Sequence, residues 1–146
     1  MSPKELLSSI RKKDLESLAL EHQIIEVETR LTRISPVLSD MPSSHGGNDK
    51  MTDGVAKLIE LKEKLNRKID ETCEDKSKLY NLMGKIENIT YRTILIQRYM
   101  NYKSFEQIAV DMNYSYQHVC RLHGQALIQF NNMHNNESRN RGSIEK

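Results

Sequence analysis

Two hydrogen-bonding side chains, Gln117 and Arg121, stand four residues apart in the last third of the chain. A glutamine amide can bond N6 and N7 of adenine, and an arginine guanidinium can bond O6 and N7 of guanine. Residues four apart share one face of a helix. The pair therefore predicts recognition of base edges by a helix, and the alternative is an ordinary solvated face of a helical bundle.

Other chemistry is poorly supported by residue types and spacing. His118 and His123 flank Cys120, but two histidines five apart diverge on a helix and no second ligand pair exists for a metal. The chain has no glycine-rich phosphate loop, no HExxH motif and no recognisable nucleophile context. We therefore expect a protein without a metal, a cofactor or enzymatic activity.

Two helices joined by a short turn are predicted to position the pair, within the stretch Ser104–Phe130. Ser104 begins an S-x-x-Q capping box, so a first helix should start at the next residue. Asn113 tolerates the left-handed conformation that a tight turn needs. Ser115 can cap the second helix.

The second helix has an apolar and a polar face. Its apolar face should hold Val119, Leu122, Ala126, Leu127 and Phe130, and its polar face Tyr116, Gln117, Cys120, Arg121 and Gly124. A short helix, a turn and a longer helix with a polar face form a helix-turn-helix, which places the second helix in a DNA major groove. Gly124 costs about 1 kcal/mol relative to alanine, which indicates a close approach, to a neighbouring helix in the first instance or otherwise to DNA.

Long helices with narrow apolar seams are predicted for residues 1–89. Ser2 and Glu5 form a capping box around a first helix. Its seam has spacings of four and three, and four further apolar residues (Leu7, Leu15, Leu18 and Ile25) widen it. The seam positions are Leu6, Ile10, Lys13, Ser17, Leu20, Ile24, Val27, Leu31 and Ile34, and in a second helix Val55, Leu58, Leu61 or Lys62, Leu65, Ile69, Thr72, Lys76, Leu79, Met83 and Ile86. This predicts a coiled-coil-like helical hairpin that oligomerises.

Breaks in these patterns divide the chain. Ser35-Pro36 should end the first helix, and residues 35–50 should form a flexible loop. A helix-turn-helix domain should cover 90–130, with Thr90 capping its first helix and Asn101 as a left-handed end of that helix. The polar tail 131–146 is predicted to be disordered.

Composition and charge limit the possible binding partners and the cellular compartment of the protein. Net charge is +2, and the surplus lies in residues 90–146, with seven basic side chains against four acidic ones. This weak basic bias permits nucleic-acid binding but does not make a single copy bind tightly. The chain has no apolar run long enough to span a membrane and only two distant cysteines. We expect an all-α protein with free thiols in a reducing cytoplasm.

The stretch 91–130 resembles region 4 of bacterial sigma-70-type factors, in YRTILIQRYMNYKSFEQIA and in YSYQHVCRLHGQALIQF. Most of the chain is similar to phage and prophage late-gene regulators of the ArpU and RinA type. The resemblance implies base contacts from the start of the second helix, with His118 flanking them, and we expect the loop lysine Lys103 to touch phosphate. The implied base-contacting residues are Ser115, Tyr116, Gln117, Cys120 and Arg121.

These observations predict a sequence-specific, non-enzymatic transcriptional regulator that binds double-stranded DNA as a homo-oligomer. Host RNA polymerase is a further candidate partner. Two alternatives remain open. A small terminase subunit also joins a helix-turn-helix to oligomerising helices but recognises packaging sites, and an adaptor would bind RNA polymerase or another regulator instead of DNA.

Overall fold

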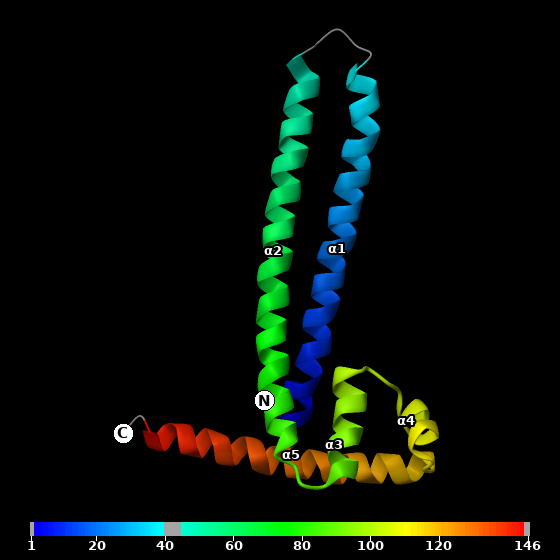
Figure 1. Ribbon diagram of the computed structural model, residues 1–146, viewed down its shortest axis with the longest axis vertical. Coiled ribbons are helices and arrows are strands. Elements are labelled where there is room, and N and C mark those ends of the chain that lie inside the picture. The colour runs from blue at the N-terminus through cyan, green and yellow to red at the C-terminus, as the bar shows by residue number, and fades with distance from the viewer. Residues whose placement is uncertain (1, 40–44, 145–146) are drawn as a thin grey trace. The chain divides into compact units, whose positions relative to one another are not determined.

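The computed structural model describes residues 2–39 and 45–144, and it describes side chains for residues 2–33 and 50–144. All regular structure in these ranges is helical, which confirms the predicted all-α class (Figure 1). Within them, five α-helices follow one another, with a π-helical turn after the third. They are α1 (Pro3–Ser39), α2 (His45–Gly84), α3 (Ile89–Leu95), η1 (Ile96–Met100), α4 (Phe105–Met112) and α5 (Tyr116–Ile144).

The chain divides into two units, which we call the middle unit (Lys13–Thr72) and the terminal unit (Met1–Lys12 with Cys73–Lys146). α1 and α2 contribute to both units, because each helix crosses a unit boundary. α3, η1, α4 and α5 belong to the terminal unit. The division does not coincide with the predicted boundary at residue 90, since the start of α1 and the end of α2 pack with the helices that follow.

α1 begins as predicted. The Ser2 N–H donates to a Glu5 carboxylate oxygen (2.7 Å), and the Glu5 N–H donates to Ser2 Oγ (3.2 Å). The two hydrogen bonds satisfy donors that the first turn of a helix leaves free. The hydrogen bond from the Ser2 backbone N–H to the Glu5 carboxylate, with a smaller contribution from the Ser2 side chain, holds the pKa of the Glu5 carboxyl below its ordinary value.

In the middle unit the predicted seams of α1 and α2 pack against each other. Leu20, Ile24 and Leu61 are buried, and half-buried side chains surround them: Val27, Leu58 and Leu65. Spacings of three and four bring these residues to one side of each helix. The polar seam positions Ser17 and Thr72 are buried as well. Thr72 donates its hydroxyl hydrogen bond to the backbone of its own helix (2.7 Å).

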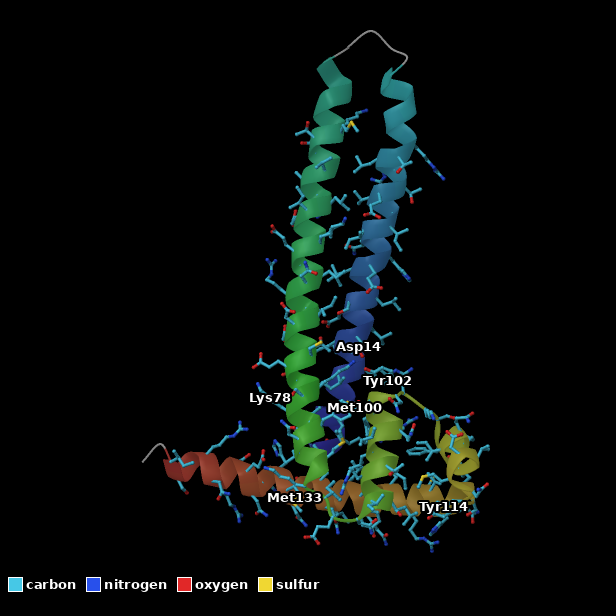
Figure 2. All side chains as sticks on the ribbon, in the orientation of Figure 1. Asp14, Lys78, Met100, Tyr102, Tyr114 and Met133 are labelled. Atoms are coloured by element: carbon cyan, nitrogen blue, oxygen red, sulfur yellow. The ribbon has the colours of Figure 1, made fainter. Side chains whose placement is uncertain are left out.

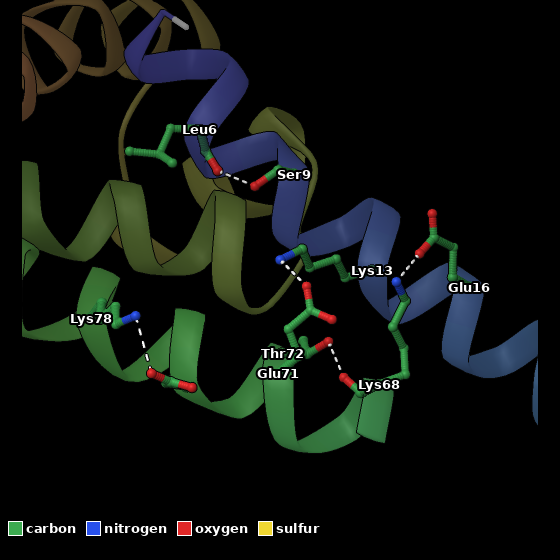
Figure 3. Close-up of polar contacts among 9 residues, drawn as sticks. Leu6, Ser9, Lys13, Glu16, Lys68, Glu71, Thr72 and Lys78 are labelled. Carbon is green, nitrogen blue, oxygen red and sulfur yellow. Dashed lines mark hydrogen bonds and ion pairs between the residues drawn. The ribbon is translucent and has the colours of Figure 1, made fainter. Parts of the chain in front are cut away.

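Ion pairs across the two helices give their direction. Glu16 of α1 pairs with Lys68 of α2 (2.6 Å), and Glu28 pairs with Lys62 (3.1 Å). Residue numbers rise along α1 while they fall along α2, so the helices run antiparallel. Figure 3 shows the Glu16 pair beside a third one, in which Lys13 contacts the next turn of α2. Such exposed pairs contribute at most about 1 kcal/mol each.

Three residues predicted to widen the seam of α1 do not do so. Leu15, Leu18 and Ile25 are 55%, 44% and 58% exposed, respectively. One neighbouring helix covers only one face of α1, and these residues recur on another face. The fourth predicted residue, Leu7, is buried in the terminal unit.

The prediction of a flexible loop over residues 35–50 is wrong where the structure describes the backbone. α1 continues through Pro36 to Ser39, α2 begins at His45, and residues 40–44 lie outside the described chain. A proline removes only one hydrogen bond from a helix that passes through it. The bias against helix in the residue before proline is a preference that a continuing helix overrides.

Two buried clusters form the core of the terminal unit. The larger joins the ends of α1 and α2 to α3, η1 and α5, through Leu7, Ile10, Leu79, Leu82, Met83, Ile86, Leu95, Tyr99, Met100, Ala126 and Phe130. The smaller joins α3, α4 and α5 through Ile94, Ile108, Ala109 and Val119. α5 contributes to both clusters, so its orientation against α3 and α4 is fixed by packing.

The connections around α3 and η1 differ from the prediction. Asn88, rather than Thr90, is the N-cap of α3, and its side chain accepts a hydrogen bond from a backbone N–H three residues on (3.2 Å). Asn101 stays right-handed (φ −100°), whereas Tyr102 is left-handed (φ 59°). This conformation is uncommon for a bulky residue. Arg11 lies over the ring of Tyr102, 5.8 Å from its centroid, and Tyr102 is labelled in Figure 2.

α5 continues through most of the stretch predicted to be a disordered tail. It ends at Ile144, so the prediction for residues 131–146 is wrong up to that point, and the last two residues lie outside the described chain. Met133, labelled in Figure 2, packs against the larger cluster, and Glu137 forms an ion pair with Lys85. These tertiary contacts keep a polar sequence helical.

Candidate nucleic-acid interface

The turn between α4 and α5 forms from the residues that the sequence indicates. Ser104 caps α4, and its Oγ accepts a hydrogen bond from the Gln107 N–H (3.2 Å). Asn113 ends α4 in the left-handed conformation (φ 56°). Ser115 Oγ then accepts from the His118 N–H (3.1 Å) in the first turn of α5. These three local predictions are confirmed, and they fix where α5 begins.

The capping box at α4 is only half formed. The Gln107 side chain does not return to the cap but donates to Asp111 Oδ1 (2.9 Å). Lys103 Nζ contacts the other oxygen of the same carboxylate (2.8 Å). The hydrogen bond from Lys103, and to a smaller extent the one from Gln107, holds the pKa of the Asp111 carboxyl below its ordinary value. Lys103 therefore lies beside α4 with its charge already paired, and it can meet a phosphate only in addition to that carboxylate.

α5 is two-sided over its first four turns, as predicted. Val119, Ala126 and Phe130 are fully buried. Gln117 and Arg121 are exposed, on the opposite side of the helix. The remaining predicted site residues at and just before the start of α5 differ in exposure. Ser115 and Tyr116 are exposed, whereas His118 and Cys120 are half-buried.

Arg121 is held by a neighbouring side chain. Its guanidinium lies 2.9 Å from His118 Nδ1. An arginine has no acceptor, so Nδ1 accepts in this contact. The His118 ring in turn meets the Tyr114 ring edge-on, with centroids 4.9 Å apart. Tyr114, labelled in Figure 2, lies in the turn before α5, so a row of three side chains leads from the turn to the guanidinium.

Most basic side chains near α5 already have partners. Arg92 donates two hydrogen bonds to the Ile86 carbonyl (3.2 and 2.8 Å). Arg98 donates to the Lys103 carbonyl (3.0 Å) and lies over the Phe105 ring. In the part of the chain that the structure describes, Arg121 has no carboxylate or carbonyl partner. Among the described basic side chains near the start of α5, it is thus the one most available to a ligand.

Tyr116, which is exposed, and Cys120, which is half-buried, form a second pair at the start of α5. A hydrogen bond with the Cys120 side chain is the main cause that raises the pKa of the Tyr116 hydroxyl. The hydroxyl therefore stays protonated at neutral pH and can donate a hydrogen bond. Both residues are predicted base contacts, and the structure brings them together one helical turn apart.

His123 is buried in the core, which was not predicted from the sequence. Its Nε2 lies 2.7 Å from the Tyr99 hydroxyl, and the Phe105 ring meets it edge-on. Burial, with smaller contributions from Arg98 and Lys4, lowers the pKa of His123 to about 4. Its burial could have been predicted from its position four residues after Val119, on the apolar side of the helix.

The structure separates the two histidines considered as metal ligands. The His118 ring reaches the exposed guanidinium of Arg121, whereas His123 contacts Tyr99 in the core. Among the described residues, no three acidic, histidine or cysteine side chains come together in a way that could hold a metal ion. The described helices also include none with the length and apolar content needed to cross a membrane.

Comparison with known proteins identifies a family but no activity. A family described as "Protein of unknown function (DUF1492)" matches residues 33–131, more than half of the chain. The match covers α2, α3, α4 and the first half of α5. Neither curated proteins nor solved structures give a match. The chain therefore belongs to the DUF1492 family.

Proposed function

We propose that this protein is a sequence-specific, non-enzymatic regulator of transcription that binds double-stranded DNA through α4 and α5. The observation that carries the proposal is the exposed pair Gln117 and Arg121, which α5 presents opposite its buried side. In this proposal α4, the turn at Asn113 and α5 act as a helix-turn-helix. The first turns of α5 enter the major groove, where residues at the start of a recognition helix contact base edges.

The proposed contacts follow from the donors and acceptors. Gln117 would bond an adenine, and Arg121 a guanine, each through two hydrogen bonds. The His118 contact orients the guanidinium before DNA arrives, so less rotamer entropy is lost on binding. Ser115, Tyr116 and Cys120 complete the edge of the site, and Lys103 approaches a phosphate.

A second copy of the chain is part of the proposal. Among the described basic side chains near the start of α5, Arg121 is the one without an anionic or carbonyl partner, and one such charge contributes little affinity by release of counterions. Two copies would present two α5 helices to two half-sites. The exposed apolar residues of the middle unit supply a surface for association. They are Leu15, Leu18 and Ile25 of α1, and Val55, Ile59 and Ile69 of α2.

The resemblance to sigma region 4 and to ArpU- and RinA-type regulators supports a phage or prophage origin. On this basis the regulator would act in the cytoplasm of a bacterial host, with RNA polymerase as a further partner. Family membership is compatible with this assignment and supplies no activity of its own.

Selection from a random pool of duplex DNA by the full-length protein tests the proposal. Repeated capture and amplification should enrich a motif, and two inverted copies of that motif should appear at a fixed spacing. Gln117 and Arg121 predict adenine and guanine within each copy. Retention of DNA without enrichment of any motif would refute sequence-specific recognition, and lack of retention would refute DNA binding.

A further inference from the structure

Gly124 has no reason within the fold to be a glycine. It lies in the interior of α5, where a glycine costs about 1 kcal/mol relative to alanine. A β-carbon added at this position would meet no atom within 4 Å. A neighbouring helix was the first expectation for this glycine, and the open space around the residue shows that this expectation is wrong.

The other described glycines differ from Gly124. A β-carbon on Gly54 would lie 2.5 Å from Leu31 Cδ2, so that glycine permits the close approach of α1 and α2. Gly84 is the last residue of α2, and Gly142 lies two residues before the end of α5. Among the four glycines whose surroundings the structure describes, Gly124 is the one that combines a helix interior with open space.

Gly124 lies on the exposed face that carries the proposed base contacts. It is seven residues after Gln117 and three after Arg121, which is two turns and one turn along the same side of α5. Without a side chain, the main chain of α5 is more accessible here than anywhere else on this face. Glycine is the usual residue where a backbone must approach a ligand closely.

Resting on the proposed function, we infer that Gly124 is the point where a sugar–phosphate strand of the duplex crosses α5 in contact with its main chain. Gln117 and Gly124 lie about 10 Å apart along the helix axis. The major groove is about 12 Å wide. If Gln117 reaches the floor of the groove, Gly124 lies where the helix leaves it, beside the strand that forms the groove wall.

Contact with the strand, rather than with a base, determines the expected effect. Contacts to phosphate and sugar position a protein on DNA but carry no direct sequence information. Side chains added at Gly124 should therefore weaken binding to all duplexes by a similar factor. Arg121, one turn earlier, should instead affect the preferred sequence.

The test compares Gly124→Ala and Gly124→Leu with Gly142→Ala in the full chain. All three add a side chain at an exposed helical position with open space, so each should keep or raise the melting temperature. Gly142→Ala should bind like wild type. Gly124→Leu should bind both the duplex selected by the wild-type protein and the unselected random pool roughly fivefold or more weakly, since an inserted side chain must displace a packed strand. Gly124→Ala should show a smaller loss.

Titrations by fluorescence anisotropy, with sedimentation of the free proteins, give separate outcomes. If the wild-type protein binds duplex DNA and Gly124→Leu binds equally well, the inference is overturned and the proposed function stands. If Gly124→Leu disrupts self-association while each copy keeps its DNA affinity, this face meets protein, which also overturns the inference. If the wild-type protein binds no duplex, both proposals fall.

Discussion

Replacing His123 with glutamine removes a titrating group from the core of the terminal unit. The imidazole Nε2 shares a hydrogen bond with the Tyr99 hydroxyl, whose pKa is itself raised by burial. A glutamine amide has both a donor and an acceptor, so it can form this hydrogen bond in either direction without taking up a proton. The variant therefore separates the protonation of His123 from the loss of its polar contact.

The size of the change in stability follows from the lowered pKa of His123. The pKa of His123 is about 4 in the folded protein, against about 6.5 for an ordinary histidine. Burial disfavours the charged ring most, and Arg98 and Lys4 add positive charge nearby. The unfolded chain binds the proton more readily, so the folded state loses stability as pH falls below about 6.5. By linkage, the loss between pH 7 and pH 5 is about 2 kcal/mol.

Urea unfolding of both proteins at the two pH values measures this loss. All six tyrosines lie in the terminal unit, so near-ultraviolet circular dichroism follows that unit. Other titrating groups are common to both proteins and cancel in the difference. The free energy of unfolding of wild type relative to His123→Gln should fall by about 2 kcal/mol from pH 7 to pH 5. A difference that does not change with pH would refute the argument that His123 is buried in its neutral form.

Three further predictions concern association, the core and phosphate contact. Leu18→Lys combined with Ile25→Lys should convert an oligomer to a monomer in sedimentation without loss of helicity, because both residues are exposed in the single chain; an unchanged mass would exclude this surface. Val119→Asp should lower the free energy of unfolding by about 3 kcal/mol or more through a buried unpaired charge. Ile128→Asp, on the exposed side of α5, should change it by less than about 0.5 kcal/mol. Urea unfolding of both variants measures the two changes. Lys103→Ala should weaken binding to selected and random duplexes by the same factor, and a loss restricted to the selected duplex would contradict phosphate contact.

The features that the sequence predicted correctly depend on neighbours within one helical turn. Ser104 and Ser115 accept hydrogen bonds from backbone groups three residues away, and Asn113 adopts its turn conformation by itself. Periodicity likewise predicted which side of α5 is buried, because Val119 and Ala126 recur at helical spacing. Such signals are contained in a short stretch of chain.

The features that the sequence did not predict depend on distant partners. Tyr99 gives His123 a hydrogen-bond partner 24 residues away. An ion pair between Lys85 and Glu137 joins the end of α5 to a residue 52 positions earlier. Composition alone could not show that such contacts keep the tail helical. For the candidate site, spacing predicted the exposed pair on α5 but not the open space at Gly124, which requires the positions of all neighbouring atoms.

The central claim is that Gln117 and Arg121 of α5 recognise bases, and titration of their alanine variants tests it most directly. Each variant is titrated with the duplex selected by the wild-type protein and with single-base variants of that duplex, with circular dichroism as the control for folding. Loss of a bidentate contact should cost roughly 1–3 kcal/mol and should remove discrimination at one base pair per half-site. If both variants bind the selected duplex as tightly as wild type and keep its discrimination, α5 is not the recognition helix and the proposed function is wrong.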